Sequence, residues 1–362
     1  MALFSKTKAA ISPPPSKAAA AGGGFETGTG RAMIGAYYNY FEGDARNAAM
    51  SVPTVSRARD LIASVIGCMP LQMYNEMWNG DEMEKMPLAP RSWLRRIDPS
   101  VPNNFILSWT FDDLFFYGRA FWYITARTAD GFPTAFTRLP ASMVLTLDQA
   151  GPVWFAPSKE VQFNGNTLNP NDLVQFLSPI QGITSMSTQA VATALKLEAA
   201  RYRNASSAIP AGVLQVQAGS EPLSSTELAD LAASFNSARA TNQTAALSPE
   251  VHYIETATSP DKMLLIDSAE FQGKEMARIC NVPLYLVGFD QGSYAYTSNE
   301  GARADLWTFG ARAYADCITS TLSQNNVLPN GSYVEFDTMN YLMGDYHDMP
   351  QVEDNERVES PT

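Results

Sequence analysis

The stretch Ala277-Arg278-Ile279-Cys280-Asn281-Val282-Pro283-Leu284-Tyr285-Leu286-Val287-Gly288, followed by Tyr296-Thr297-Ser298-Asn299-Glu300, joins two predicted helices. Apolar residues at helical spacing predict a helix from about Ser259 to Cys280, and Pro283 ends it because proline cannot continue the hydrogen-bond ladder. The Gly-, Tyr- and Ser-rich segment 288–298 indicates a loop. Asn299 then suits the N-cap of a helix that runs to about residue 324, with Glu300 in its first turn.

A strand–helix–strand unit is predicted before this stretch. Its strands are Gly212–Val216 and Val251–Glu255. The helix between them begins at the capping box Ser224-Ser225-Thr226-Glu227, in which the serine hydroxyl accepts from the N3 amide and the glutamate reaches back. Residues 236–246 are small and polar, and they predict a loop.

A second helix precedes this unit and is expected over 188–204. Val191, Leu195, Ala199 and Tyr202 form its apolar stripe. The unit 209–258 is therefore expected to lie between two helices.

The N-terminal part mixes short helices and strands. Residues 1–48 are rich in Pro, Ala and Gly and predict a flexible arm, so order is expected near Met50. An aromatic helix is expected over 103–117, ended by Gly118 and buried on most sides. Further elements are expected as helices at 53–67 and near Trp93 and as strands at 69–74, 121–125, 143–147, 153–156, 173–177 and 333–336. The fold class predicted is α+β.

Composition excludes several kinds of protein. The chain has 362 residues, 37 acidic and 25 basic, and a net charge of −12. This balance argues against tight clamping of nucleic-acid phosphates. Residues 335–362 contain eight of the acids and one arginine, so the acidity is concentrated at the C-terminus. No apolar run is long enough to span a membrane, and the N-terminus has no secretory signal core.

Common catalytic and metal-binding motifs are also absent. Cys68, Cys280 and Cys317 are not at C-x-x-C spacing and are expected to be buried thiols, while His252 and His347 lie far apart. No Walker loop, G-x-S-x-G or H-E-x-x-H motif occurs. We therefore expect no enzyme activity, no cofactor and no metal.

The opening stretch resembles the portal proteins of tailed bacteriophages, which carry a segment similar to VP-x-x-(L/V)-G followed by Y-(S/T)-N-x-E. Here Asn299 and Glu300 are adjacent, which departs from that pattern. Tyr117-Gly118-Arg119-Ala120-Phe121 is similar to the family's YGNA(F/Y) junction, with Arg119 in place of asparagine. Leu139–Val144 is similar to its L-x-P-x-x-V strand. Each motif is weak alone, but they occur in the same order as in the family between about Met50 and Leu342.

The resemblance implies a portal-like architecture with a mixed wing domain, a two-helix stem, a strand–helix–strand clip and a long helix behind a tunnel loop. The implied regions are an arm (1–48), wing (49–183), first stem helix (184–208), clip (209–258), second stem helix (259–284), tunnel loop (285–299), long helix (300–328), wing strand (329–343) and acidic tail (344–362).

The resemblance also implies a function. Portal proteins form a ring, a homododecamer in this family, at the capsid vertex. Double-stranded DNA passes through the ring during packaging and ejection, and the ring contacts terminase, the capsid or scaffold protein and head–tail connector proteins. The protein is then expected in the virion, and in the host cytoplasm during assembly.

The expected functional residues are contact residues. Candidates facing DNA in the tunnel loop are Gly288, Gln291, Gly292, Ser293, Tyr294, Tyr296, Thr297, Ser298 and Asn299. Candidates for clip contacts are Ser224, Glu227, Arg239 and Asn242.

Two other functions are compatible with parts of the sequence: another phage structural or adaptor protein, and a carboxylate-dependent hydrolase. Asp112-Asp113 is the pair that would suggest glycoside chemistry. Neighbouring helical residues point about 100° apart, so we expect one solvated acid and one packing acid. Trp109, Phe115 and Phe116 are expected in the core.

Overall fold

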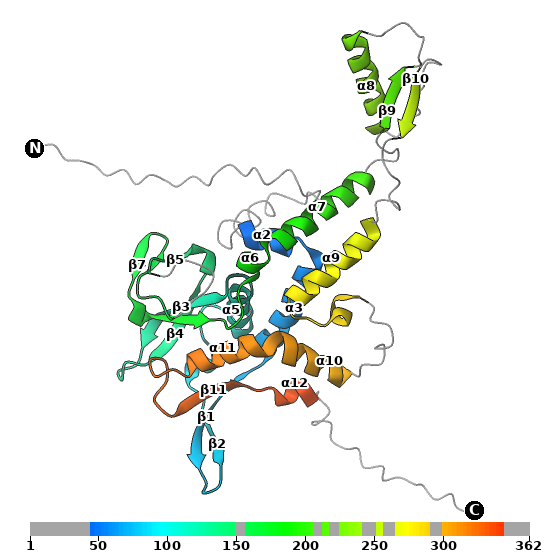
Figure 1. The fold of residues 1–362 in the computed structure, drawn as a ribbon. Helices are drawn as coiled ribbons and strands as arrows, with labels where there is room; N and C mark the ends of the chain where they lie inside the picture. Colours follow the sequence, from blue (N-terminus) through cyan, green and yellow to red (C-terminus); the bar gives the residue numbers. More distant parts are fainter. Residues whose placement is uncertain are drawn as a thin grey trace, which may run out of the picture.

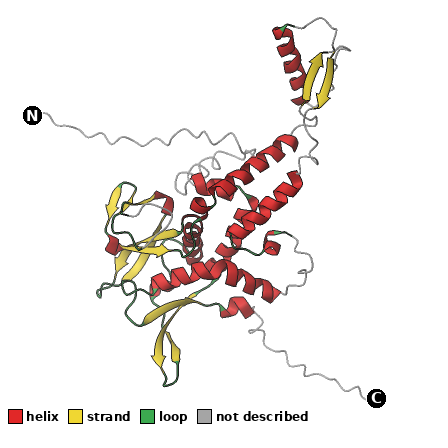
Figure 2. Cartoon of the chain, viewed as in Figure 1, coloured by secondary structure: helices red, strands yellow, loops and turns green. Residues whose placement is uncertain are grey.

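The computed structural model describes residues 44–148, 156–205, 212–216, 224–240, 251–255, 265–289 and 299–343 (Figure 1). The predicted strand at 153–156 and the acidic tail 344–362 lie outside these residues, apart from Ala156. Small sheets flank a central group of helices, which confirms an α+β fold (Figure 2).

The helices and strands have the following bounds. The α-helices are α2 (Asp44–Met50), α3 (Pro53–Cys68), α4 (Ser92–Arg95), α5 (Asn103–Tyr117), α6 (Ile183–Met186), α7 (Thr188–Ala205), α8 (Ser225–Ala240), α9 (Leu265–Ile279), α10 (Asn299–Asp305), α11 (Arg312–Leu322) and α12 (Met339–Met343). The strands are β1 (Leu71–Trp78), β2 (Met83–Leu88), β3 (Arg119–Arg127), β4 (Pro133–Leu139), β5 (Val144–Thr146), β6 (Val161–Phe163), β7 (Asn166–Leu168), β8 (Leu173–Leu177), β9 (Gly212–Val216), β10 (Val251–Glu255) and β11 (Ser332–Phe336). Short 3₁₀ turns are η2 (Ala141–Met143), η3 (Pro170–Asp172) and η4 (Leu284–Val287), and η6 (Leu306–Ala311) is π-helical.

All strand pairs among the described residues are antiparallel. The sheets have the orders β11-β1-β2, β4-β3-β8, β5-β6-β7 and β10-β9. In the first sheet the late strand β11 pairs with the early strand β1, so segments from early and late in the chain form one sheet. The predicted strands at 173–177, 212–216 and 251–255 are confirmed to the residue.

Helix α5 lies at the centre of the main core. It has no polar face, and nine of its residues, from Ile106 to Phe116, are buried. Phe111 meets Tyr314 of α11 edge-on at 5.1 Å between ring centroids. Gly118 ends the helix in a left-handed conformation with φ of 73°, which glycine adopts without a Cβ clash. The expected burial of α5, including Phe115 and Phe116, is confirmed, while Trp109 is half-buried at the edge of the core.

Both aspartates of α5 are fully buried, so the expectation of one solvated acid is wrong. Arg46 of α2 binds the two carboxylate oxygens of Asp112 at 2.8 and 2.9 Å, and Arg59 of α3 adds a third contact at 2.6 Å. Arg138 of β4 binds Asp113 at 2.7 and 2.8 Å. These three arginines offset the free-energy cost of removing the two carboxylates from water, which would otherwise be too high for them to be buried.

Trp109 of the same helix connects the two ion pairs. The guanidinium carbons of Arg46, Arg59 and Arg138 lie 4.9, 5.2 and 5.0 Å from the centre of its ring. The indole face attracts cations, so it stabilises the three guanidinium groups that gather around the two buried aspartates. We call these six residues the Asp–Arg cluster.

The Asp–Arg cluster also changes the N-terminal boundary. Residues 44–48, which the sequence predicts as part of a flexible arm, form the start of α2, and Arg46 and Ala49 are buried. The reason is tertiary: a seven-residue helix has little stability alone, but Arg46 is needed to neutralise Asp112.

Helix α9 ends earlier than the predicted stem helix 259–284. The Val282 amide donates to the carbonyl of Ala277, and the Asn281 amide donates to that of Arg278. Asn281 has φ of 54°. This is a Schellman motif with asparagine in the left-handed position usually taken by glycine, so the helix stops at Ile279 and the chain turns.

The expected long helix 300–328 also differs from the structure. The helical path begins at Asn299, passes through the π-helical turn η6 and ends at Leu322. Gly310 lies in this turn, where an added Cβ would stand 3.3 Å from Ile62. A π turn absorbs an extra residue in a helix, and here it occurs where the helix packs on α3.

Several smaller predictions are corrected. Helix α8 continues to Ala240, so 236–240 is not loop. The expected first stem helix 184–208 begins as the short α6, and α7 follows from Thr188. Cys68 is exposed, while Cys280 and Cys317 are buried. The sequence did not predict β2, β4, β6 or β7. Each pairs with a neighbouring strand across a short connection, but β2 is exposed along most of its length and β6 and β7 have only three residues each, so no clear apolar alternation marks these three.

Replacing Asp112 by asparagine should destabilise the body by about 3 kcal/mol or more, because Arg46 and Arg59 lose their buried counter-charge. The matched control is Asp60→Asn: Asp60 contacts Arg59 as well, at 2.9 Å, but is exposed. Its loss should cost about 1 kcal/mol or less. Chemical denaturation measures both. Equal losses for the two variants would show that Asp112 is not the critical partner.

Candidate functional site

The segment between α9 and α10 is attached to the body at two ends, which we call its roots. The first root follows directly after α9. After the Schellman turn, η4 runs to Val287, and Gly288 closes it with φ of 92°. Phe289 then folds back onto α9, where an added Cβ on Gly273 would lie 2.2 Å from the Phe289 ring. Gly273 therefore provides the space that lets Phe289 pack against the helix.

The second root is tied to the first. The Tyr285 hydroxyl donates to a carboxylate oxygen of Asp305 in α10 at 2.9 Å. Partial burial and this carboxylate raise the pKa of Tyr285 to about 12. The phenol therefore stays protonated and keeps donating at all physiological pH values. The hydrogen bond joins η4 to α10, so both ends of the segment are held on the body.

Only two candidate residues of the expected tunnel loop are described. Gly288 and Asn299 are exposed at its two roots. The other candidates lie outside the described residues: Gln291, Gly292, Ser293, Tyr294, Tyr296, Thr297 and Ser298. The structure therefore gives the roots of this segment.

Helices α7 and α9 lie side by side and extend from the body (Figure 1). The Gln272 side chain donates to the carbonyl of Ala190 at 3.2 Å across the pair. The predicted apolar stripe of α7 is buried only near the body: Val191 is 8% exposed, whereas Tyr202 is 71% exposed. Ile266 and Phe271 of α9 are also exposed. The outer part of the helix pair thus presents apolar side chains to its surroundings.

The strand–helix–strand unit lies beyond the outer ends of α7 and α9 (Figure 1). Its strands pair from Val251↔Val216 to Glu255↔Gly212. The predicted capping box is confirmed: the Ser224 amide donates to the Glu227 carboxylate at 2.8 Å, and the Glu227 amide donates to the Ser224 hydroxyl at 3.4 Å. The Ser224 amide, and the Ser224 hydroxyl that also donates to the Glu227 carboxylate at 2.8 Å, lower the pKa of Glu227.

The other two clip candidates are not brought to this cap. Arg239 lies in the last turn of α8, at the opposite end from Ser224. Asn242 lies outside the described residues. Ser224 and Glu227 serve the helix start itself, so their hydrogen bonds have a structural role whether or not they contact a partner.

The described part of the chain presents no arrangement for metal chemistry. Within it, no group of three or more His, Cys, Asp or Glu side chains is placed to hold an ion. Asp112 and Asp113, the pair that suggested a hydrolase, have no access to solvent and are bound by arginines. No helix among the described residues is long and apolar enough to cross a membrane.

Comparison with known families identifies the family of the chain. The family model described as phage portal protein matches residues 53–352. The chain belongs to the phage portal protein family. No curated protein matches it in a sequence search.

Several solved structures share the fold. An HK97-family phage portal protein from Corynebacterium diphtheriae is 20% identical, with a TM-score of 0.67, and the match covers 84% of this chain and 98% of that one. A chain of the virion of a native gene transfer agent is 14% identical, with a TM-score of 0.56 over 84% and 89% of the two chains. A chain in the neck of an empty gene transfer agent particle, computed with C6 symmetry, is 13% identical, with a TM-score of 0.55 over 86% and 92%.

Sequence reasoning missed the residues that hold this portal fold together. One signal was present: Arg59 occupies the same stripe of α3 as Val55, Ile62 and Ile66, all of which are fully buried. A charged residue at such a position needs a buried partner. The Tyr285–Asp305 hydrogen bond had no comparable signal, because it joins two elements across the loop.

The capping box predicts a specific loss of stability. Replacing both Ser224 and Ser225 by alanine, so that no neighbouring hydroxyl substitutes, should cost about 1 kcal/mol of α8 stability. Ser234→Ala is the matched control, since its hydroxyl bonds only Leu231 within the same helix. Hydrogen exchange of the α8 amides measures both. Unchanged protection in the double variant would contradict the cap.

The same box should respond to pH. The folded pKa of Glu227 lies below its ordinary value of 4.5. The stabilisation of α8 by the ionised carboxylate is therefore complete above that pH and disappears as the pH falls through the lowered pKa. Glu227→Gln should remove this acid-dependent part of the α8 protection.

Proposed function

We propose that this chain is the subunit of a portal ring at a capsid vertex, through which double-stranded DNA is packaged and ejected. The observation that carries the proposal is the match to the phage portal family over residues 53–352. A dodecamer is proposed as the assembly; a related neck structure of a gene transfer agent particle was computed with C12 symmetry. The proposed locations are the virion and, during assembly, the host cytoplasm.

The regions of the subunit follow from its elements. We assign the body containing α3, α5 and the three three-stranded sheets to the wing, α7 and α9 to the stem, and β9–α8–β10 to the clip. The clip would contact terminase during packaging and head–tail connector proteins afterwards, because it is carried away from the body on the stem. The capsid or scaffold protein would contact the wing.

The segment between Phe289 and Asn299 is proposed as the tunnel loop. Its roots suit this role, because Phe289 is seated at Gly273 and Tyr285 is bonded to Asp305. Such roots would let the proposed tunnel loop change position without disturbing the body. The candidates between these roots include Tyr294 and Tyr296, whose aromatic rings and hydroxyls would slide along DNA as neutral contacts.

The charge of the chain suits a conduit better than a clamp. A protein that neutralises many phosphates binds DNA tightly and in a salt-dependent way. This chain has an excess of acids, many of them at its C-terminus. A weakly acidic channel would let DNA pass without adhering to the wall.

Ring assembly is the first test. The purified protein should form closed rings with a mass near twelve times the 39.5 kDa of the chain, as measured by mass photometry and negative-stain electron microscopy. Particles that remain monomeric or dimeric across concentrations and salt conditions that support assembly would contradict the proposed function.

Shortening the proposed tunnel loop tests its separate role. Removing residues 291–296 should leave rings and DNA-free heads at normal yield but reduce the number of heads that retain a full genome. A length-preserving Tyr294→Ser/Tyr296→Ser variant separates the effect of loop length from that of the aromatic side chains. Full-genome yields equal to those of the unaltered protein in both variants would remove the role of the loop.

A further inference from the structure

The hairpin formed by β1 and β2 projects from the body, at the end opposite the β9–α8–β10 unit (Figure 1). Four large apolar side chains near its tip are exposed: Met77 (55%), Trp78 (63%), Met83 (54%) and Met86 (43%). We call these four residues the hairpin tip. An edge strand with exposed apolar side chains invites unwanted pairing unless something covers it.

The hairpin tip is apolar on both faces. Trp78 lies opposite Met83, and residues that face each other across an antiparallel pair project to the same side. Met77 is the neighbour of Trp78 along the strand and therefore points to the other face. Asn75, two residues before Met77, points to that same face, and so does Met86, which lies opposite Asn75. Such a tip has the shape of a wedge, which suits a groove better than a flat surface.

The wedge is held rigidly. The Asn79 side chain accepts from the amides of Asp81 and Glu82, both at 3.0 Å, and so fixes the turn. Nearer the body, Lys85 pairs with Glu335 of β11, and Tyr74 stacks on Tyr333 at 5.5 Å between ring centroids. A rigid tip loses little conformational entropy when it binds.

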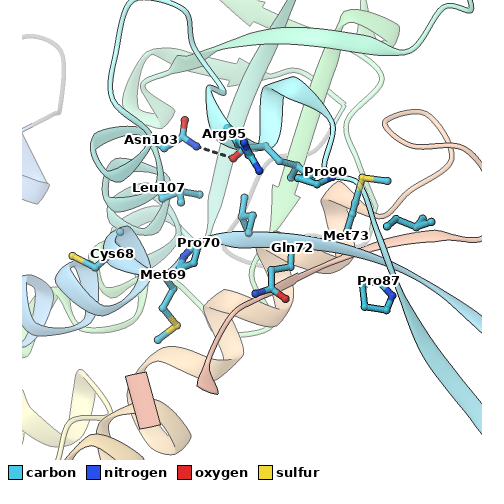
Figure 3. A pocket seen from close by; sticks show the side chains of 14 residues that line it. Cys68, Met69, Pro70, Gln72, Met73, Pro87, Pro90, Arg95, Asn103 and Leu107 are labelled. Carbon is cyan, nitrogen blue, oxygen red and sulfur yellow. Dashed lines mark hydrogen bonds between the residues drawn. The ribbon is translucent and has the colours of Figure 1, made fainter. Parts of the chain in front are cut away.

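A groove of matching character lies at the base of the same hairpin (Figure 3). It has a volume of about 570 Å³ and lies between the end of α3, the base of β1 and β2, the end of α4 and the start of α5. Its lining is mostly apolar and includes Met69, Pro70 and Leu107. The exposed Cys68 and Arg95 lie at its rim.

The two surfaces are complementary in charge. The turn and first part of β2 carry Asp81, Glu82 and Glu84, and none of these carboxylates pairs with a cation among the described residues. Arg95 at the groove likewise has no acidic partner in the described part of the chain. An acidic apolar wedge and a basic apolar groove can therefore satisfy each other.

The hairpin tip cannot fill the groove of its own subunit. Met83 is five residues along the strand from Leu88, which lines the groove, and at about 3.3 Å per residue this separates them by roughly 17 Å. A head-to-tail ring, however, needs two different surfaces that complement each other on neighbouring copies. We propose that the hairpin tip of one subunit docks into the groove of the next copy of this chain; this rests on the ring proposed above.

The natural Cys68 allows a direct test. Met83→Cys places a second thiol on the hairpin tip, at an exposed site where the fold tolerates it, while Cys280 and Cys317 are buried and do not compete. Rings treated with a mild oxidant or a short bis-maleimide should give a ladder of covalent multimers on denaturing gels, with most subunits incorporated.

Two controls define the specificity of this ladder. Met83→Cys combined with Cys68→Ser removes the groove thiol and should lower the cross-linked fraction at least tenfold. Leu145→Cys places a thiol at a similarly exposed site (59%) on β5, away from the hairpin, and should give only the background level.

The outcomes separate the docking from the ring itself. Rings of normal mass in which Met83→Cys cross-links no better than Leu145→Cys would overturn the docking and leave the portal ring standing; the arm 1–43 or another protein would then be the occupant to seek. A protein that forms no rings contradicts the proposed function, and the docking with it.

Charge reversal gives an independent readout. In the Met83→Cys background, Arg95→Glu should reduce the cross-linked fraction several-fold, and adding Glu82→Lys and Glu84→Lys should restore it. An unchanged fraction in the Arg95→Glu variant would contradict the proposed charge pairing and count against this groove as the docking site.

Discussion

The fold depends on two carboxylates that have no access to water. Asp112 and Asp113 lie side by side in α5, a helix with no polar face, and each must be neutralised by a partner from elsewhere in the chain. Arg46, Arg59 and Arg138 supply the charges from α2, α3 and β4. Because removing one member of such a set leaves a buried charge unpaired, the cluster makes the docking of these three elements interdependent. It specifies their arrangement as well as stabilising it.

A rigid body of this kind explains why the proposed moving and contacting parts lie outside it. The loop after Phe289 starts and ends on residues that are seated on the body, with Tyr285 bonded to Asp305. The outer helix pair and the β1–β2 hairpin instead expose apolar side chains such as Tyr202, Phe271 and Trp78. One subunit alone leaves these surfaces uncovered, and the proposed ring would give them neighbours.

Prediction from sequence succeeded where local chemistry is sufficient. The capping box at Ser224 and Glu227 formed as expected, and α5 ended at Gly118, where the backbone adopts a positive φ. Helix and strand bounds in these regions depend on neighbours within a few residues. The prediction failed for Arg46, which was assigned to a flexible arm, and for the solvated aspartate of α5, since a charged residue does not reveal in sequence which distant partner will accept it.

The sequence by itself determined the order of elements: a helix, the strand–helix–strand unit, a second helix and a further helix that begins at Asn299. It also placed the end of α9 close to Pro283, because caps, turns and periodicity act over short separations. Only the tertiary structure decided the buried ion pairs, the early start at α2, the π turn at Gly310, and the separation of an acidic wedge from the groove at its base. These features depend on residues tens to hundreds of positions apart, as when β11 pairs with β1. The free-energy cost of each buried charge depends on which distant residues surround it in the fold, and a local sequence pattern does not reveal those residues.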